Sequence, residues 1–413
     1  MEPASLVIAP IGELVSLDPQ RITADNPCGR LAQAAVVVTD GAFAWVGQAA
    51  DLPDFYRDAP RMDASDLCIV PGLVDSHTHL VFAGRRSDEF ALKVKGVPYM
   101  EIAARGGGIL ATVRATRRAS VDELVTLALP RLKVSLGFGV TTMEVKSGYG
   151  LDTDTELKML EVIGLLNDMQ PLELVPTFMG AHEFPEEFRD NRDGYVDLVC
   201  GEMIPAVAAQ GIARFVDVFC EQGVFTPKQT ARILAAGMAH GLKPRIHADE
   251  FAESGGAQVA ARFHALSADH LMAVGAQGIR ALADAGVVAT LLPGTSLFLG
   301  KKRYADARAL IQAGVTVAVA TDFNPGSCMS QNLPLMGHLA CTQMGMSPEE
   351  AMAAITCNAA KSLGLSSVGR IVPGMRADLA GLAIPAMDDF FYHFGVNHTA
   401  FVMKSGCLVW EAC

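Results

Sequence analysis

Between residues 71 and 365, short apolar runs alternate with longer segments in which apolar residues recur every three or four positions. Runs of four to eight apolar residues predict buried strands, and the longer period predicts amphipathic helices. Eight strands are predicted: one begins at Ile69, and the others lie at 140–145, 172–178, 215–220, 244–248, 265–269, 287–292 and 315–320. Helices are predicted at 121–136, 154–168, 195–210, 227–240 and 347–364. Eight such units favour a (β/α)8 TIM barrel over a doubly wound open sheet, which has no need of eight.

The two ends of the chain have a different pattern. Residues 1–67 hold only short apolar runs, and two of these, 35–39 and 42–47, flank Asp40-Gly41, a dipeptide that favours a tight hairpin. Strand-like runs return at 400–403 and 407–410. Short β segments are rarely stable alone. We therefore expect one small β-sandwich domain, formed by 1–70 together with 366–413, beside a catalytic barrel at 71–365.

The composition is that of a well-buried globular enzyme, with 50% hydrophobic and 19% charged residues. A net charge of −12 makes nucleic acid and anionic membranes poor partners. The nine cysteines are scattered without a CxxC pair, which is typical of reduced thiols in the cytoplasm. We find no signal-peptide pattern and no apolar stretch of transmembrane length. We expect a cytoplasmic location and a homodimer.

Metal-compatible side chains follow several predicted strands, at the ends that form the active site of such barrels. His77 and His79 follow the first strand at a spacing that places both on one face. The others are His182 after the third strand, His247 after the fifth, His270 after the sixth and Asp322 after the eighth. A catalytic metal needs about three N or O ligands and an open position for water. His77, His79, His247 and Asp322 can supply that set.

The fourth strand ends in residues 218–221 (VFCE) without a lysine. Barrels of this type with two metals commonly use a modified lysine there as a bridge, so we expect a single metal ion. The metal would lower the pKa of its bound water. A nearby carboxylate, Glu250 or Asp322, would move the water proton to a leaving nitrogen, and His270 can polarise a substrate carbonyl.

These catalytic roles have alternatives. Glu250 can instead be a solvated loop charge, and His270 can be an orienting group behind the metal. Asp75 lies deeper in the first strand, and we interpret it as structural. The glycines at 106–108 lack the lysine and hydroxyl residue of a phosphate loop, so they favour a flexible lid loop. The remaining histidines are interpreted as structural or exposed; they are His240, His264, His338, His393 and His398.

A cluster of cations follows the first strand in an otherwise acidic chain. Its members are Arg85, Arg86, Lys93 and Lys95. Arginine binds carboxylates through two parallel hydrogen bonds, so the cluster favours a small anionic substrate, although a solvated cluster is an equal alternative. Tyr149 after the second strand can stack on a planar ring. Asn324, Gly326 and Ser327 can offer amide, backbone and hydroxyl contacts.

Several motifs resemble a known group of enzymes. Residues 71–79 (PGLVDSHTH) resemble the opening motif of the metal-dependent amidohydrolase superfamily, and His247, 319–322 (VATD) and 369–379 resemble its later ligand positions and its return to the small domain. Within the superfamily, five segments together are similar to the imidazolonepropionase family over nearly the whole chain. They are 82–86 (FAGRR), 144–151 (EVKSGYGL), 177–183 (TFMGAHE), 247–250 (HADE) and 321–327 (TDFNPGS).

The resemblance implies hydrolysis of the ring amide C–N bond of 4-imidazolone-5-propanoate to N-formimidoyl-L-glutamate, in histidine degradation. It implies one zinc or iron ion held by His77, His79, His247 and Asp322. It places the heterocyclic substrate against Arg86, Tyr149, His182 and Glu250, with Asn324, Gly326 and Ser327 near the product. Two other hypotheses stay open: a related amidohydrolase or deaminase acting on another cyclic amide or nucleobase, and a barrel that has lost its metal.

Overall fold

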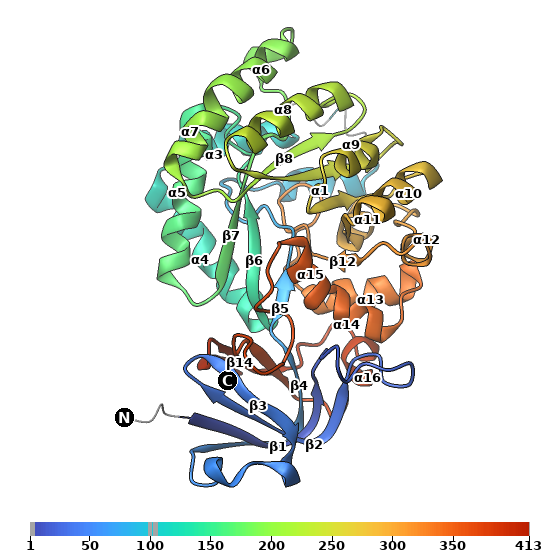
Figure 1. Cartoon of the computed structure of the whole chain (residues 1–413). Helices are drawn as coiled ribbons and strands as arrows, with labels where there is room; N and C mark the ends of the chain where they lie inside the picture. The colour runs from blue at the N-terminus through green and yellow to red at the C-terminus, as the bar shows by residue number, and fades with distance from the viewer. Residues whose placement is uncertain (1–4, 98–100, 102–105, 413) are drawn as a thin grey trace.

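The computed structural model describes residues 5–97, 101 and 106–412. These residues form a barrel and a separate β domain, and both ends of the chain belong to the β domain (Figure 1). The chain enters the barrel after its first 71 residues and returns near its C-terminus. The predicted combination of a TIM barrel with a small β domain from both termini is confirmed, while its exact boundaries at 70 and 366 stay a prediction.

Eight parallel strands are hydrogen-bonded in chain order from β5 to β12. They are β5 (Leu73–Asp75), β6 (Val140–Lys146), β7 (Glu173–Ala181), β8 (Phe215–Cys220), β9 (Lys243–Ala248), β10 (Ser267–His270), β11 (Val288–Leu291) and β12 (Val317–Val319). The barrel is nearly closed, because a parallel bridge joins Thr78 beyond β5 to Phe323 beyond β12. Each predicted strand is present within a few residues.

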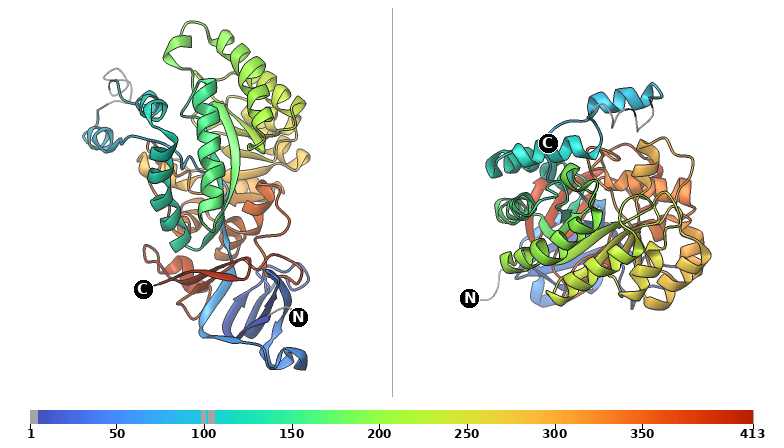
Figure 2. Two further views of the ribbon diagram at one scale, coloured as in Figure 1. Left: turned by 90° about the vertical axis from the view of Figure 1, so that its left-hand side faces the viewer. Right: turned by 90° about the horizontal axis from the view of Figure 1, so that it is seen from above.

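Helices surround the strands when the barrel is viewed from above (Figure 2). The longest cover the first strands and are α4 (Val121–Gly137), α5 (Thr153–Met169) and α8 (Pro227–Ala239). Between β7 and β8, α6 (Arg192–Leu198) and α7 (Ile204–Gln210) are joined by a π turn at Val199–Met203. Further barrel helices are α9 (Gly256–Arg262), α10 (Ala276–Ala285), α11 (Pro293–Phe298), α12 (Ala307–Gln312) and α13 (Leu333–Met344).

Two regions differ from the sequence-based expectation. The connection at 81–119 contains α1 (Ser87–Val94) and α3 (Ile109–Arg118), and Figure 2 shows α1 projecting from the barrel. The predicted helix at 347–364 is two helices, α14 (Pro348–Ala354) and α15 (Cys357–Ser362), because Thr356 between them leaves the helical conformation. Gly108 directly precedes α3 at a φ of 78°, which glycine adopts without strain.

The β domain is one seven-stranded mixed sheet in the order β15-β14-β13-β4-β1-β2-β3. Its strands are β1 (Ser5–Val15), β2 (Arg30–Thr39), β3 (Ala42–Gln48), β4 (Arg61–Pro71), β13 (Leu379–Leu382), β14 (Thr399–Lys404) and β15 (Cys407–Glu411). Phe43 from β3 and Phe401 from β14 belong to one buried core, so strands from both halves of the sheet pack around the same apolar residues. The short helix α16 (Asp388–Tyr392) lies between β13 and β14.

The two parts meet at a very short joint. β4 of the small sheet ends at Pro71 and β5 of the barrel begins at Leu73, so only Gly72 lies between them. A Cβ on Gly72 would lie 2.3 Å from the Thr141 hydroxyl oxygen, which explains why glycine is needed there. Within the described residues, no helix is long and apolar enough to cross a membrane.

Candidate metal centre and substrate cavity

His77, His79 and Asp322 meet where the first and last barrel strands end. The Asp322 amide donates to the His77 carbonyl (3.0 Å), and the His79 amide donates to the Phe323 carbonyl (2.9 Å). This pairing brings Oδ1 of Asp322 to 3.5 Å from Nε2 of His77 and to 3.6 Å from Nε2 of His79. Backbone hydrogen bonds between two distant segments therefore set the spacing of the three side chains.

His247 completes a buried group that fits a metal ion. Its ring centroid lies 4.5 Å from that of His77, and ligand atoms of His77, His79 and His247 all lie within 4.8 Å of one another. Ligand atoms of His77, His270 and Asp322 likewise lie within 4.8 Å of one another. Nε2 of His77 and of His247 are buried without a hydrogen-bond partner among the described residues, a costly state for a polar atom. Convergent N and O donors with two unpartnered nitrogens fit a divalent metal.

Burial favours the neutral imidazole form of His77, His79 and His270. It lowers the pKa of His77, His79 and His270 well below the ordinary value, and neighbouring histidines and Lys146 lower it further. Burial likewise lowers the pKa of His182 to about 3. Neutral imidazole has a free lone pair, which is the form that binds metals.

Two aspartates that the sequence analysis did not identify fix the histidine tautomers. Nδ1 of His77 donates to Oδ2 of Asp269 (2.7 Å), and Nδ1 of His247 donates to Oδ1 of Asp217 (3.0 Å). A carboxylate on Nδ1 leaves Nε2 free for a metal. Asp217 is an acidic residue inside the otherwise apolar run of β8, which was an available signal, whereas β10 reads Ser-Ala-Asp-His and gives no such contrast for Asp269.

Two hydroxyl groups lie beside the carboxylate of Asp322. The Thr295 hydroxyl donates to its Oδ2 (2.6 Å), and the Ser327 hydroxyl lies 3.4 Å from the same oxygen. Burial raises the pKa of Asp322 to about 6, although the Thr295 hydrogen bond opposes this shift. Asp75 accepts from the Thr321 amide (3.0 Å) and hydroxyl (2.6 Å), which joins β5 to the end of β12 and suits a structural role.

Glu250 and His270 are neighbouring buried groups beside the histidines. Nδ1 of His270 lies 3.7 Å from Oε2 of Glu250. Burial, followed by the charges of Asp322 and Glu221, raises the pKa of Glu250 well above its ordinary value. A carboxyl group that holds its proton in this way is suited to acid–base chemistry near neutral pH.

Glu221 ties the end of β8 to the loop that carries Glu250. Its two carboxylate oxygens accept from the amides of Gln222 (2.7 Å) and Phe251 (2.8 Å). Glu221 directly follows a barrel strand, which is the position where functional side chains were sought, but the sequence analysis did not select it. The structure places it in the cavity wall.

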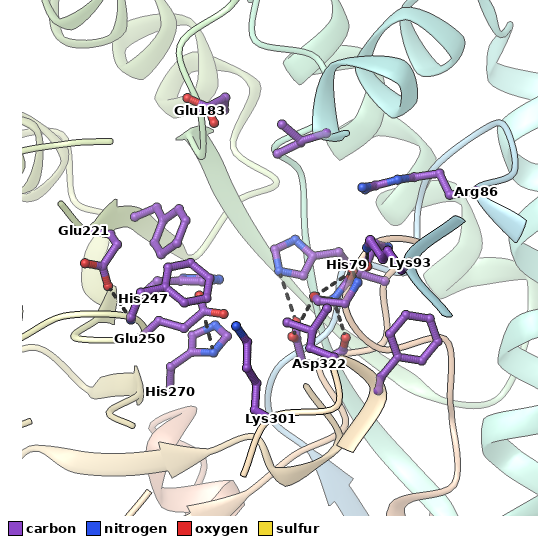
Figure 3. A pocket seen from close by; sticks show the side chains of 18 of the residues that line it. His79, Arg86, Lys93, Glu183, Glu221, His247, Glu250, His270, Lys301 and Asp322 are labelled. Atoms are coloured by element: carbon purple, nitrogen blue, oxygen red, sulfur yellow. Dashed lines mark hydrogen bonds and ion pairs between the residues drawn. The ribbon is translucent and has the colours of Figure 1, made fainter. Parts of the chain in front are cut away.

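These side chains surround a cavity of about 760 Å³ at the carboxyl end of the barrel. Figure 3 shows Glu221, Glu250 and His270 on one side of the cavity and Arg86 and Lys93 on the other. The predicted residues that line it are His79, Arg86, Tyr149, His182, His247, Glu250, His270, Asp322, Asn324, Gly326 and Ser327. His77 does not line the cavity because it is fully buried beneath it. Lining residues that were not predicted include Phe90, Glu183, Phe219, Glu221 and Lys301.

Of the four cations after the first strand, two line the cavity and two are exposed. Arg85 and Lys95 belong to the exposed pair. Arg86 forms a salt bridge with Glu89 (3.0 Å), and the Lys93 ammonium donates to the Gly326 carbonyl (3.0 Å). The two contacts hold the cations at one end of the cavity, so that end is suited to an anionic group.

Flat rings form the wall between the cations and the metal group. The rings of His79 and His182 stack at a centroid distance of 4.8 Å and an interplanar angle of 17°. Tyr149, only 2% exposed, lies 5.4 Å from His182 between centroids. Nδ1 of His182 donates to the Gly148 carbonyl (3.0 Å). A planar heterocycle would find stacking partners on this wall.

The loop after Asp322 is organised by Asn324. Its Oδ1 accepts from the Gly326 and Ser327 amides, both at 2.8 Å, and its Nδ2 donates to the Asp322 carbonyl (2.7 Å). The Asn324 amide is therefore engaged within its own loop. Gly326 packs against Arg86, since a Cβ there would lie 2.3 Å from a guanidinium nitrogen.

Sequence comparison finds close relatives over most of the chain. Residues 68–409 match the Amidohydrolase family. An imidazolonepropionase from Alkaliphilus metalliredigens is 49% identical over 84% of this chain and 83% of its own. Imidazolonepropionases from Geobacillus kaustophilus and Symbiobacterium thermophilum are 48% and 46% identical, covering 92% and 99% of this chain and 91% and 98% of theirs.

Solved structures with low sequence identity have the same fold. A mutant atrazine chlorohydrolase from Arthrobacter aurescens TC1, complexed with zinc and atraton, has a TM-score of 0.74 at 17% identity and covers 98% of this chain and 95% of its own. An adenosine deaminase from Xanthomonas campestris with bound zinc has a TM-score of 0.72 at 18% identity, covering 98% of this chain and 93% of its own.

Proposed function

The chain belongs to the imidazolonepropionase family of amidohydrolases, and we propose that it hydrolyses the ring amide C–N bond of 4-imidazolone-5-propanoate. The product would be N-formimidoyl-L-glutamate, as in histidine degradation. One arrangement carries the proposal: a single cavity joins a metal-compatible group to a cationic end across a wall of flat rings. Its two ends suit a ring amide and a propanoate carboxylate.

We propose one zinc or iron ion per chain, held by His77, His79, His247 and Asp322. Neutral imidazoles and a carboxylate suit either metal, so the donor set does not select between them. When bound, such an ion polarises a carbonyl oxygen and lowers the pKa of water. The single site is supported by the end of β8, where residues 218–221 contain no lysine that could bridge a second ion.

The side chains of the cavity divide the remaining tasks. Glu250 orients the attacking water, and one carboxylate, Asp322 or Glu250, takes up its proton and returns it to the ring nitrogen as the C–N bond breaks. His270 stabilises the negative charge that develops on the carbonyl oxygen. Tyr149 and His182 contact the ring, and Arg86 binds the propanoate carboxylate. Asn324, Gly326 and Ser327 shape the adjoining wall near the product.

A substrate panel tests this function. The purified protein should remove the absorbance of 4-imidazolone-5-propanoate and produce one equivalent of N-formimidoyl-L-glutamate. Purines, pyrimidines and imidazolones without a carboxylate should be turned over much more slowly, because they lack the anionic group that Arg86 and Lys93 would bind. Faster turnover of a nucleobase would instead favour a deaminase, and a metal-free protein inert towards every substrate would favour a barrel without catalysis.

We also propose that the enzyme is a cytoplasmic homodimer. All cysteines of the described part are free thiols, which fits a reducing compartment. Sedimentation velocity should give a mass near twice 43.7 kDa. A mass equal to one chain at micromolar concentration would contradict the dimer without touching the proposed reaction.

A further inference from the structure

Five charged side chains lie inside the barrel beneath the metal-compatible group. They are Glu144 and Lys146 on β6, Asp217 on β8, Arg245 on β9 and Asp269 on β10, and each is 0% exposed. Burying ions is costly, and apolar residues often replace buried ion pairs without loss of stability. A network of this size directly under a reaction centre therefore calls for a functional explanation.

Lys146 is the centre of this network. Its ammonium nitrogen lies 2.6 Å from Oε1 of Glu144, 2.7 Å from Oδ2 of Asp217 and 3.8 Å from Oδ2 of Asp269. An ammonium group has three N–H donors, so it can face all three carboxylates. Arg245 supports only one aspartate directly, with a nitrogen 3.2 Å from Oδ2 of Asp269. Its other hydrogen bonds go to the carbonyls of Ser76 and Ser362.

Both aspartates use their remaining contacts on metal-compatible histidines. Asp217 binds Lys146 through Oδ2 and accepts from His247 through Oδ1. Asp269 accepts from His77 through the oxygen that faces the two cations. Lys146 therefore connects the supports of two histidines that come from opposite parts of the chain.

Glu144 extends the network to the main chain between His77 and His79. Its Oε2 accepts from the Thr78 amide (3.3 Å), and its carbonyl accepts from the Thr78 hydroxyl (2.6 Å). The Thr177 hydroxyl donates to Oε1 (2.5 Å). The network thus reaches the side chains that orient His77 and His247 and the backbone that carries His79.

We propose that Lys146 is a positioning residue for the metal centre: it locks Asp217 and Asp269 so that His77 and His247 present Nε2 to one point. The inference rests on the proposed metal site, and it assigns a role to a side chain that contacts neither metal nor substrate. Lys146 holds Asp217 through the oxygen that does not face His247, and it faces the same Asp269 oxygen that accepts from His77. Without it, Asp217 loses the cation on its Oδ2 and Arg245 remains the only network cation beside Asp269, so the two histidines lose their common orientation.

The charge of Lys146 complicates a single substitution, because removing a cation also removes repulsion towards a metal ion. The double substitution Glu144→Gln with Lys146→Met avoids this effect. It changes the network from three acids and two bases to two acids and one base, so its net charge stays the same. Glu144→Gln alone measures how much the loss of the Glu144 carboxylate contributes to the change in zinc affinity.

Lys404→Met is a matched control. Lys404 is also a buried lysine, 9% exposed, and its ammonium donates to Asp378 (2.8 Å). It lies on β14 in the small sheet, away from the cavity. Its loss removes a comparable buried ion pair and should change the melting temperature without changing metal binding.

The test measures the zinc dissociation constant of metal-free protein by competition with a chelator, together with the visible spectrum of the cobalt-substituted protein. Glu144→Gln with Lys146→Met should weaken zinc binding by about 10-fold or more, as for other changes behind metal ligands, and should shift the cobalt bands. Lys404→Met should stay within about 2-fold of the wild type, a difference too small to indicate a lost ligand support. Glu144→Gln alone should weaken zinc binding less than the double variant does, because Lys146 still pairs with Asp217.

Wild-type affinity and an unchanged cobalt spectrum in the double variant would overturn the role of Lys146. Failure of the wild-type protein to bind zinc or cobalt would instead contradict the proposed function. If circular dichroism shows that the double variant is unfolded, Lys146→Arg decides. It keeps the charge but cannot direct a planar guanidinium to three carboxylates in the same way, so weaker zinc binding supports the role and unchanged binding overturns it.

Discussion

At the scale of a residue, the buried carboxyl group of Glu250 suits the proposed acid–base role but lowers the stability of the folded protein near neutral pH. Burial and two neighbouring carboxylates raise its pKa, so the folded protein holds this proton more tightly than the unfolded chain does. The resulting stabilisation is fully present below about pH 4 and is lost as the pH rises through the raised pKa. At neutral pH Glu250 therefore opposes folding of the metal-free protein.

Glu250→Gln should lower kcat by about 100- to 10,000-fold, because a neutral amide cannot move the water proton. The same substitution should raise the melting temperature of the metal-free protein at pH 7–8, and this gain should vanish below about pH 4. Glu161→Gln, an exposed change on α5, is the control and should alter neither quantity. Near-normal kcat in both Glu250→Gln and Asp322→Asn would contradict the proposed proton route.

Arg86 and Arg85 form a natural pair for testing the cationic end of the cavity. Arg86→Ala should raise KM by about 10- to 100-fold, as expected for a lost hydrogen bond to a charged group, with a much smaller change in kcat. Arg85→Ala should leave both constants nearly unchanged, because Arg85 is exposed. Steady-state kinetics with the anionic substrate makes the comparison, and an unchanged KM for Arg86→Ala would remove its proposed role.

Sequence reasoning identified the residues at strand ends better than those inside strands. The carboxyl ends of parallel strands converge in any such barrel, so His247 and Asp322 could be selected from position alone. Asp217 is a charged residue within an apolar run and Lys146 is the last residue of β6, and only the folded barrel pairs them. The hydrogen bond from the Gly326 amide to the Asn324 side chain also depends on a turn that the sequence pattern does not predict.

At the scale of an element, the short strand β5 is important because it links the small sheet to His77 and His79. Beyond β5, the backbones of His77 and His79 form hydrogen bonds with those of Asp322 and Phe323, which follow β12. Movement of the joint at Gly72 would therefore disturb His77 and His79. The buried Thr141 side chain blocks any larger residue at the joint.

Gly72→Ala should destabilise the protein by about 1–3 kcal/mol, the usual cost of overpacking a close-packed site. Gly201→Ala is a contrasting control, because that helical position has open space for a Cβ and should gain roughly 0.5–1 kcal/mol. Urea unfolding of the two variants measures the difference. Equal stabilities for Gly72→Ala and the wild type would show that the joint tolerates a side chain.

Hydrophobic periodicity located the barrel strands and the long helices because these elements bury a regular face. It failed for α1, because its apolar residues Phe90 and Val94 line the cavity and remain 45% and 71% exposed instead of packing into the core. It merged α14 with α15, since the break at Thr356 interrupts the backbone without interrupting the apolar pattern. The apolar pattern alone therefore missed a helix outside the regular alternation of strands and helices, and it did not reveal the break between two adjacent helices.

At the scale of the whole molecule, the barrel brings residues from the ends of seven strands, β5 to β10 and β12, to one cavity, and the β domain holds the first strand in place. The protein is acidic overall, with a net charge of −12, yet it places Arg86 and Lys93 at one end of that cavity. Metal binding should also stabilise the fold, because the buried donor atoms converge only in the native state. Chelation should therefore lower the melting temperature as well as the activity.

The most direct test of the central claim is to titrate metal-free protein with zinc or ferrous iron while following hydrolysis of 4-imidazolone-5-propanoate. We expect no turnover without metal and a linear rise in activity that stops at one equivalent per chain. Full activity in the chelator-treated protein, or a requirement for two equivalents, would contradict a single-metal hydrolase built on His77, His79, His247 and Asp322.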